Sequence, residues 1–81
     1  MTGLKTPSID LTGYRCPVPV IRLEAALRRM GCDAQVIVFT DDPVAIIDIP
    51  HFCGGAGHAV QIEARDGDRC VFKVTKNAKS A

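Results

Sequence analysis

The chain has 81 residues, of which 47% are hydrophobic and 23% are charged, and its formal net charge is +1. This length accommodates one small domain around a single core and leaves no room for a second. The near-neutral charge argues against a basic surface for nucleic-acid phosphates, and 5% aromatic residues are too few for a base-stacking surface. No apolar run approaches the roughly 20 residues that span a bilayer. We therefore expect neither membrane insertion nor direct nucleic-acid binding.

The first residues, MTGLKTP, contain no apolar segment of the kind that directs secretion. We therefore expect a cytoplasmic location, where thiols stay reduced. The four cysteines form no C-x-x-C pair, which argues against the usual zinc and thioredoxin-type sites. We expect free thiols and no metal or cofactor. The cysteines are Cys16, Cys32, Cys53 and Cys70.

Four segments show strand patterns. Residues 8–11 and 58–65 alternate polar and apolar side chains, and residues 35–40 form the β-branched and aromatic run of a central strand. The turn Asp66-Gly67 then leads into a last alternating run, which predicts a C-terminal hairpin. The side chains expected to face the core from the first strand and from the hairpin are Ile9, Leu11, Val60, Ile62, Ala64, Cys70, Phe72 and Val74.

Two segments show helix patterns. Apolar side chains recur every three or four positions in residues 19–30, which predicts an amphipathic helix that ends before a left-handed Gly31. An Asp-Asp-Pro run predicts a second helix that begins at Pro43. We expect Pro50 to kink or split that helix, and residues 54–57 (GGAG) to end it loosely. The apolar stripe of the first helix consists of Val20, Leu23, Leu27 and Met30.

The element order β-α-β-α-β-β predicts an α+β fold, a two-layer α/β sandwich with two helices on one face of a four-stranded mixed sheet. The right-handed crossover rule makes the first two strands parallel if they share a sheet. We expect a single domain over residues 1–81, with an ordered core from about residue 8 to 75 and a mobile polar tail at 76–81.

The most informative motif is Cys-Pro-x-Pro, which places Cys16 at the start of the first helix and directly after Arg15. A helix N-terminus and a neighbouring cation lower the pKa of a cysteine, and the thiolate is the nucleophilic form of sulfur. Because the prolines carry no N–H, we expect only the amides of Val18 and Val20 to be free among residues 17–20, and we expect them to lie beside the sulfur. We predict that Cys16 is the reactive residue. The residues expected to support it are Arg15, Pro17, Val18 and Pro19.

Residues 11–20, LTGYRCPVPV, resemble the signature of the TusA (SirA-like) family of sulfur carriers. Residues 41–43 (DDP) and 48–53 (DIPHFC), followed by Gly57-His58, also match the motifs of that family in order and spacing. The resemblance covers nearly the whole chain from residue 10 to 74. It implies a two-layer α/β sandwich like the C-terminal domain of the third translation initiation factor.

What the resemblance implies for function is a persulfide relay. Cys16 would accept a sulfane sulfur from a donor such as a cysteine desulfurase, hold it as a persulfide, and transfer it to a downstream acceptor protein. Family members serve in tRNA thiolation, molybdenum cofactor assembly and sulfur oxidation, and the sequence does not distinguish these pathways. The residues at 54–57 are smaller than those usual in the family, which we expect to affect the choice of partner.

The remaining cysteines have a simpler interpretation. Cys53 recurs at the Phe-Cys position of the family, where a resolving partner for the first thiol is conceivable. Free cysteine is among the most buried residue types, so we expect Cys53 to pack as a small hydrophobic residue, and Cys32 and Cys70 likewise.

An adaptor without catalytic activity is the alternative from a different class. In that case the loop around Cys16 and the first helix dock a partner, and the thiol is incidental. A thiol pKa at or above the ordinary value of about 8.5, together with partner binding that survives Cys16→Ala, would favour the adaptor.

Overall fold

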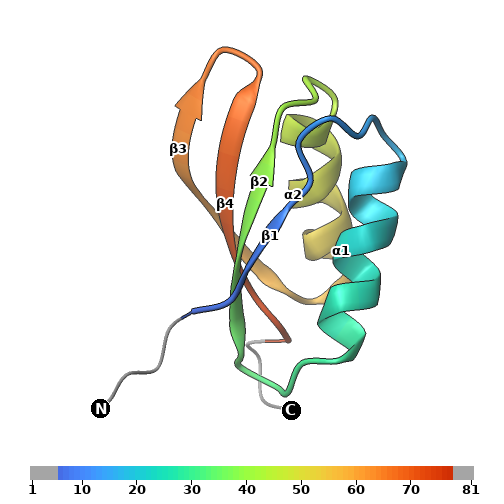
Figure 1. The fold of residues 1–81 in the computed structure, drawn as a ribbon. Coiled ribbons are helices and arrows are strands. Elements are labelled where there is room, and N and C mark those ends of the chain that lie inside the picture. The colour runs from blue at the N-terminus through green and yellow to red at the C-terminus, as the bar shows by residue number, and fades with distance from the viewer. Residues whose placement is uncertain (1–5, 78–81) are drawn as a thin grey trace.

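The computed structural model describes residues 6–77, which form a four-stranded sheet with two helices on one of its faces (Figure 1). No described element covers the other face of the sheet (Figure 1). The predicted α+β sandwich is confirmed. In chain order the elements are β1 (Ser8–Asp10), α1 (Val18–Arg28), β2 (Gln35–Thr40), α2 (Ala45–Ala56), β3 (Ala59–Asp66) and β4 (Arg69–Thr75).

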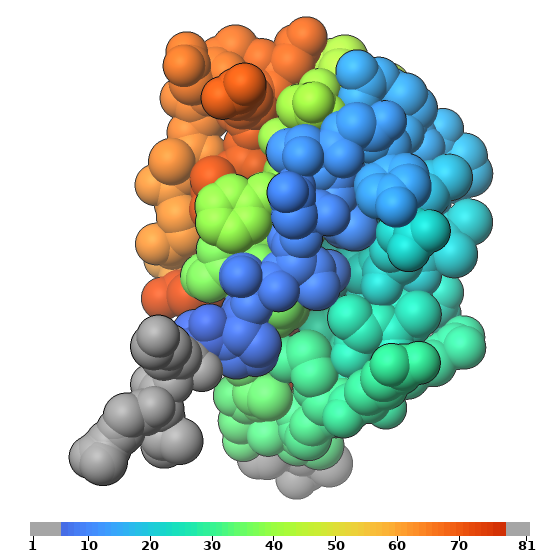
Figure 2. All heavy atoms as spheres, in the orientation of Figure 1, coloured from blue at the N-terminus to red at the C-terminus, as the bar shows by residue number. Residues whose placement is uncertain are grey.

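The strand order in the sheet is β1-β2-β4-β3. β1 and β2 are parallel, with Ile9 opposite Val38, whereas β4 is antiparallel to both β2 and β3. The predicted parallel pair and C-terminal hairpin are thus confirmed. Because the carboxyl ends of parallel strands meet at one edge of a sheet, the loops that lead into α1 and α2 begin side by side. Figure 2 shows β1 and the loop after it, in blue, between β2 and α1.

The core lies between the helices and the sheet. Leu23 and Leu27 of α1 are buried, and Val20 and Met30 pack against the core, so the predicted stripe of α1 is confirmed. Burying each large aliphatic side chain stabilises the fold by about 1.5–3 kcal/mol. The largest fully buried side chains from the other elements are Phe72, Ile49, Val36, Val38 and Val74.

α1 ends at Arg28 without a left-handed glycine. The N–H groups of the next two residues donate to carbonyls three residues earlier, each at 3.1 Å, so a tightened last turn satisfies those carbonyls. The left-handed residue of this connection is Asp33, with φ of 67°. The prediction of a left-handed Gly31 was therefore wrong.

α2 begins at Ala45 and runs unbroken through Pro50 to Ala56. The predicted start at Pro43 was wrong, and of the predicted kink or split near Pro50 the split was wrong, because the helix is continuous. Residues 43 and 44 form a turn ahead of the helix. Pro50 removes one helical hydrogen bond, but the buried side chain of Ile49 and that of Cys53, one turn later, hold both halves of the helix on the sheet.

α2 ends in a well-defined capping motif, whereas its glycine-rich sequence predicted a loose end. Gly57 adopts a left-handed conformation with φ of 86°, which glycine reaches without steric cost. The N–H of His58 then donates to the carbonyl of Cys53 at 2.8 Å, and the N–H of Gly57 to that of Gly54 at 3.4 Å. This pattern is a Schellman motif, so α2 passes directly into β3.

β3 departs from the predicted alternation. Val60 packs against the core, but Ile62 is 51% exposed and Ala64 is exposed. A bulge between Ile62 and Ala64 pairs the first with Phe72 and the second with Val71, which point to opposite faces of β4. The bulge moves Ala64 to the uncovered face of the sheet, so the predicted apolar face was wrong at Ala64. Ile62 lies on the same face as the buried Phe72 but is exposed, because β3 is an edge strand.

The start of the predicted mobile tail is fixed in place. The Lys76 N–H donates to the Ala34 carbonyl at 2.8 Å, and its Nζ donates to the Met30 carbonyl at 2.7 Å. The Asn77 N–H donates to Nδ1 of His58 at 2.8 Å. The rest of that tail, residues 78–81, lies outside the described residues. Within residues 6–77, no helix has both the length and the apolar character that crossing a bilayer requires.

Candidate functional site

Cys16 lies in the loop between β1 and α1, two residues before Val18, the first residue of the helix. Its side chain is half-buried and packs partly against the core. Pro17 follows through a cis peptide bond and occupies the N-cap position of α1, and Pro19 is buried in the first turn. The predicted placement of the thiol at a helix start is therefore correct.

Of the two amides expected to be free beside the sulfur, that of Val18 is already bonded. The N–H of Val18 donates to the carbonyl of Arg15 at 2.9 Å, and that of Ile21 donates to the carbonyl of Pro17 at 3.1 Å. The prediction of a free Val18 N–H was wrong, because the chain closes a turn over residues 15–18 before the helix begins.

Arg15 is directed to a carboxylate. Its Nη1 lies 3.0 Å from Oδ1 of Asp41, and its side chain is 61% exposed. The same Asp41 oxygen accepts the N–H of Gly13 at 2.8 Å. The Gly13 hydrogen bond and the Arg15 guanidinium hold the pKa of Asp41 below its usual range. Asp41 thereby ties the loop before α1 to the end of β2.

The other side of this loop is anchored on α1. The Arg22 guanidinium lies over the Tyr14 ring, 4.4 Å from its centroid, in a cation–π contact. Such a contact is worth about 0.5–1 kcal/mol at an exposed site. The loop that carries Cys16 is therefore held to both α1 and β2.

Asp42 contacts Cys16 directly. This carboxylate is only 3% exposed, its Oδ2 accepts the N–H of Cys16 at 2.8 Å, and its Oδ1 accepts the N–H of Val44 at 3.2 Å. Burial acts to raise the pKa of Asp42, but the hydrogen bonds from Cys16 and Val44 outweigh burial, and the pKa lies below its usual range. Asp42 is therefore a charged carboxylate in a fixed position next to the thiol.

The sulfur of Cys16 is in an acid-rich environment. Burial, followed by hydrogen bonds to the carboxylates of Asp42 and Asp48, raises the pKa of the Cys16 thiol from an ordinary value of 9.0 to about 12. The prediction of a lowered pKa was wrong. The Arg15 cation is paired with Asp41, so the positive end of the α1 dipole acts alone against two carboxylates. The free thiol is neutral near pH 7.

The remaining cysteines divide into two groups. Cys53 and Cys70 are buried in the core, and burial raises the pKa of each thiol, that of Cys53 to about 11. Their predicted packing role is consistent with these positions. Cys32 is exposed in the connection after α1, so its predicted burial was wrong. Among residues 6–77, no three His, Cys, Asp or Glu side chains gather as a metal site would require.

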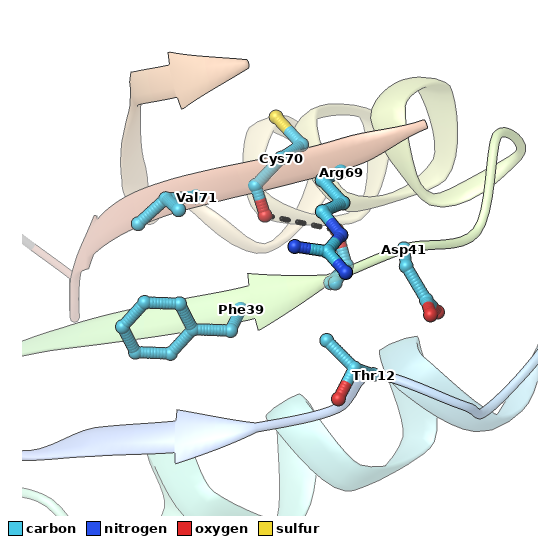
Figure 3. Close-up of a pocket in the computed structure, with 7 residues that line it drawn as sticks. Thr12, Phe39, Asp41, Arg69, Cys70 and Val71 are labelled. Atoms are coloured by element: carbon cyan, nitrogen blue, oxygen red, sulfur yellow. Dashed lines mark hydrogen bonds between the residues drawn. The ribbon is translucent and has the colours of Figure 1, made fainter. Parts of the chain in front are cut away.

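A cleft of about 410 Å³ lies on the uncovered face of the sheet, at the ends of β2 and β4 (Figure 3). Phe39, Arg69 and Val71 line it, together with Thr12 and Asp41. Cys16 is not among the lining residues. Cys16 therefore does not lie in this cleft, and it reaches solvent beside the starts of the two helices.

The sequence did not reveal that a carboxylate from a distant segment accepts the Cys16 N–H. The acidic pair at 41 and 42 was assigned only to capping the second helix, and Asp48 had no separate role. The available signal was topological: a parallel β1–β2 pair brings the loops after both strands to one edge, where residues 13–16 meet residues 41 and 42.

The sequence model of the family described as sulfurtransferase TusA matches residues 8–76, almost the entire described chain. The chain belongs to the TusA family. Two relatives, both sulfur carrier proteins TusA from Pseudomonas putida, are 31% (strain F1) and 30% (strain W619) identical over 70 residues. Each alignment covers 86% of this chain and 88% of the relative.

A solved structure of similar fold is the SirA-like protein from Desulfitobacterium hafniense. It superposes with a TM-score of 0.73 at 26% identity, covering 84% of this chain and 93% of that chain. The TusA family thus accounts for the two-layer fold as well as for the sequence match. Membership assigns this chain a general role in sulfur transfer between a donor and an acceptor.

Proposed function

We propose that this TusA-family chain carries sulfur as a persulfide on Cys16. It accepts the sulfur from a donor such as a cysteine desulfurase and delivers it to an acceptor protein in tRNA thiolation, cofactor assembly or sulfur oxidation. The relay requires reduced thiols, as in the cytoplasm. The observation that carries the proposal is the position of Cys16, half-buried at the start of α1 in a chain that matches the TusA model over residues 8–76.

The chemistry is an exchange between thiols and persulfides without net oxidation. The Cys16 thiolate attacks the terminal sulfur of the donor persulfide, a new S–S bond forms, and the donor S–S bond breaks. The donor cysteine leaves with the electron pair and takes up a proton, while the Cys16 proton has been released. Delivery repeats these steps with the acceptor thiolate as nucleophile and Cys16 as leaving group.

The surface around Cys16 suits transient docking of partner proteins. Val44 is exposed in the turn that follows Asp42, Ile47 is 70% exposed in the first turn of α2, and Tyr14 and Ile21 are exposed on the α1 side. Exposed apolar side chains that cluster around a reactive group are typical of a protein interaction site. Arg15, Pro17, Val18 and Pro19 support the site by fixing the path of the chain on either side of the thiol.

The raised pKa of Cys16 is one of the two results that would favour an adaptor. The family match favours the sulfur carrier, and the two functions differ in a direct measurement. The protein is incubated with a cysteine desulfurase and cysteine, and its intact mass is measured. We expect the wild type to gain one sulfur atom and Cys16→Ser to gain none. Cys32→Ser is the matched control because it removes an exposed thiol, and we expect it to gain one sulfur atom like the wild type. Equal gain in Cys16→Ser would contradict the proposal.

A further inference from the structure

The chain beyond β4 is bonded to the side chain of His58. Nδ1 of His58 accepts the N–H of Asn77 at 2.8 Å, across 19 residues of sequence. An imidazole nitrogen that accepts a hydrogen bond carries no hydrogen, so His58 is neutral in this contact and its hydrogen lies on Nε2. The contact therefore uses the same lone pair that binds a proton when the imidazole titrates.

The ring of His58 is held in place by contacts that do not involve Asn77. The backbone N–H of His58 donates to the carbonyl of Cys53 at 2.8 Å, in the capping motif of α2. Its ring packs against that of Phe52, with 5.9 Å between the centroids. Because β3 begins at the next residue, the backbone is fixed on both sides of His58. The position of the imidazole is thus set by α2 and β3.

Asn77 depends on His58 more than the residues before it do. The N–H of Lys76 donates to the carbonyl of Ala34 at 2.8 Å, and its carbonyl accepts the N–H of Asp33 at 2.9 Å, so the chain is still paired at this point. Asn77 follows with a left-handed φ of 32°, and its N–H bonds to His58 instead. In the described part of the chain, the His58 contact is the hydrogen bond that holds the Asn77 backbone.

The charges that face His58 disfavour a second proton on its ring. The charged side chains that line the hollow of about 230 Å³ beside the ring are Glu24, Arg28 and Lys76, and among the described residues α2 and β3 contribute none. Glu24 is paired with Arg28 at 3.2 Å, whereas Nζ of Lys76 donates to a neutral group, the carbonyl of Met30, at 2.7 Å. Burial, followed by the Lys76 ammonium, holds the pKa of His58 below its ordinary value of 6.5.

We propose that His58 is a pH-dependent clasp, which holds Asn77 at the end of β4 when the imidazole is neutral and releases it when the imidazole is protonated. The added proton occupies the Nδ1 lone pair, so two N–H groups then face each other and an imidazolium faces the Lys76 ammonium. Lys76 keeps its backbone hydrogen bonds, so the opening is confined to Asn77 and the hollow beside it.

The clasp is separate from the site of sulfur carriage. Glu24 and Arg28 lie toward the C-terminal end of α1, whereas Cys16 precedes its first residue, so the clasp and the thiol are at opposite ends of that helix. The clasp therefore neither requires nor tests persulfide formation on Cys16.

The competition for Nδ1 makes the contribution of the clasp to stability disappear in acid. The pKa of His58 is lower in the folded protein than in the unfolded chain, so the unfolded chain binds the proton more readily. The contribution is therefore fully present above pH 6.5 and is lost as the pH falls through the pKa of the folded protein.

NMR spectroscopy tests the clasp directly. The ring resonances of His58 report its protonation, and the protection of the Asn77 N–H against solvent exchange reports the contact. Between about pH 7.5 and about pH 5 we expect this protection, corrected for the intrinsic exchange rate at each pH, to fall about two- to tenfold with the midpoint of the His58 ring. His51→Gln removes the exposed histidine of α2 and is the matched control, in which we expect the same pH dependence.

Three further variants separate the parts of the clasp. His58→Gln keeps an acceptor oxygen that does not titrate, so we expect Asn77 to stay protected at both pH values. His58→Leu removes the acceptor, so we expect low protection at both. Lys76→Gln removes the cation but keeps a donor for the carbonyl of Met30, so we expect the midpoint of the His58 ring to move to higher pH.

Two results would overturn the clasp. The first is an Asn77 N–H that stays equally protected while the His58 ring is protonated, or a ring that is still neutral at about pH 5, where carboxylates begin to titrate. The second is a loss of protection in His58→Gln as large as that in the wild type. A midpoint that stays the same or falls in Lys76→Gln would contradict the effect assigned to the Lys76 ammonium.

Discussion

Oδ2 of Asp42 accepts the backbone N–H of Cys16 at 2.8 Å across 26 residues of sequence. This contact joins the loop after β1 to the loop after β2, and it places a buried carboxylate next to the thiol. It therefore connects the stability of the fold to the charge of the sulfur, and the predictions below treat these two effects separately.

Asp42→Ala is expected to destabilise the protein by about 2–3 kcal/mol, because the N–H groups of Cys16 and Val44 lose a charged acceptor. Urea unfolding followed by circular dichroism measures the change. Asp68→Ala in the exposed β3–β4 turn is the matched control, for which we expect a change within about 0.5 kcal/mol. Equal effects of the two substitutions would contradict the structural role of Asp42.

Stability is expected to fall at alkaline pH. The pKa of Cys16 is raised to about 12 and that of Cys53 to about 11, from an ordinary value of 9.0. The folded protein thus keeps protons that the unfolded chain releases, so this contribution is fully present below pH 9.0 and is lost as the pH rises through 11 to 12. Urea unfolding between about pH 8 and about pH 10.5 measures the slope.

Cys16→Ser removes one of these thiols, so the decline of its stability with pH is expected to be shallower than that of the wild type. Cys32→Ser removes an exposed thiol and is expected to show the slope of the wild type. A slope that is the same in all three proteins would show that Cys16 ionises as readily in the folded state as in the unfolded chain.

The four thiols are expected to react with a maleimide in an order set by their environments. Cys32 is exposed and reacts first, whereas Cys53 and Cys70 are buried and react only when the protein unfolds. Cys16 is half-buried and protonated, so it reacts between these limits. Mass spectrometry of digested samples over time gives the four rates. Modification of Cys16 ahead of Cys32 would indicate that the Cys16 thiol is more ionised than the carboxylates permit.

Two glycines of α2 can be replaced to stabilise the protein. Gly54 and Gly55 are helical, and a Cβ at either position meets no atom within 4 Å. Gly54→Ala and Gly55→Ala are each expected to stabilise the fold by about 0.5–1 kcal/mol. Gly57→Ala is the contrasting variant, since a left-handed φ of 86° costs a non-glycine residue about 1–2 kcal/mol. Urea unfolding should therefore give changes of opposite sign.

The fold was predictable because the sequence patterns that specify its helices and strands are local and strong. The periodic apolar positions of α1 and the β-branched run of β2 specify those elements without reference to the rest of the chain. The errors arose where tertiary contacts prevail over local preference. Pro50 lies inside a helix because Ile49 and the next turn are buried, and Ala64 faces the uncovered side because of a bulge.

The candidate site was predictable in its position but not in its electrostatics. A cysteine before two closely spaced prolines indicates a helix start from sequence alone. The partner of Arg15 and the acceptor of the Cys16 N–H come from residues 41 and 42, which are brought there by the parallel pairing of β1 with β2. Without that pairing, the helix dipole and the adjacent cation predicted a thiolate, whereas the assembled site favours a thiol.

The direction of the strands separates the reactive end of the molecule from its described chain ends. β1 and β2 run toward the Cys16 loop, and β4 runs away from it, so that Thr75 pairs with Gln35 at the opposite edge of the sheet (Figure 1). A protein fused or tethered at either side of residues 6–77 would attach at that opposite edge. Immobilisation through a terminal tag should consequently leave the sulfhydryl free to meet other proteins.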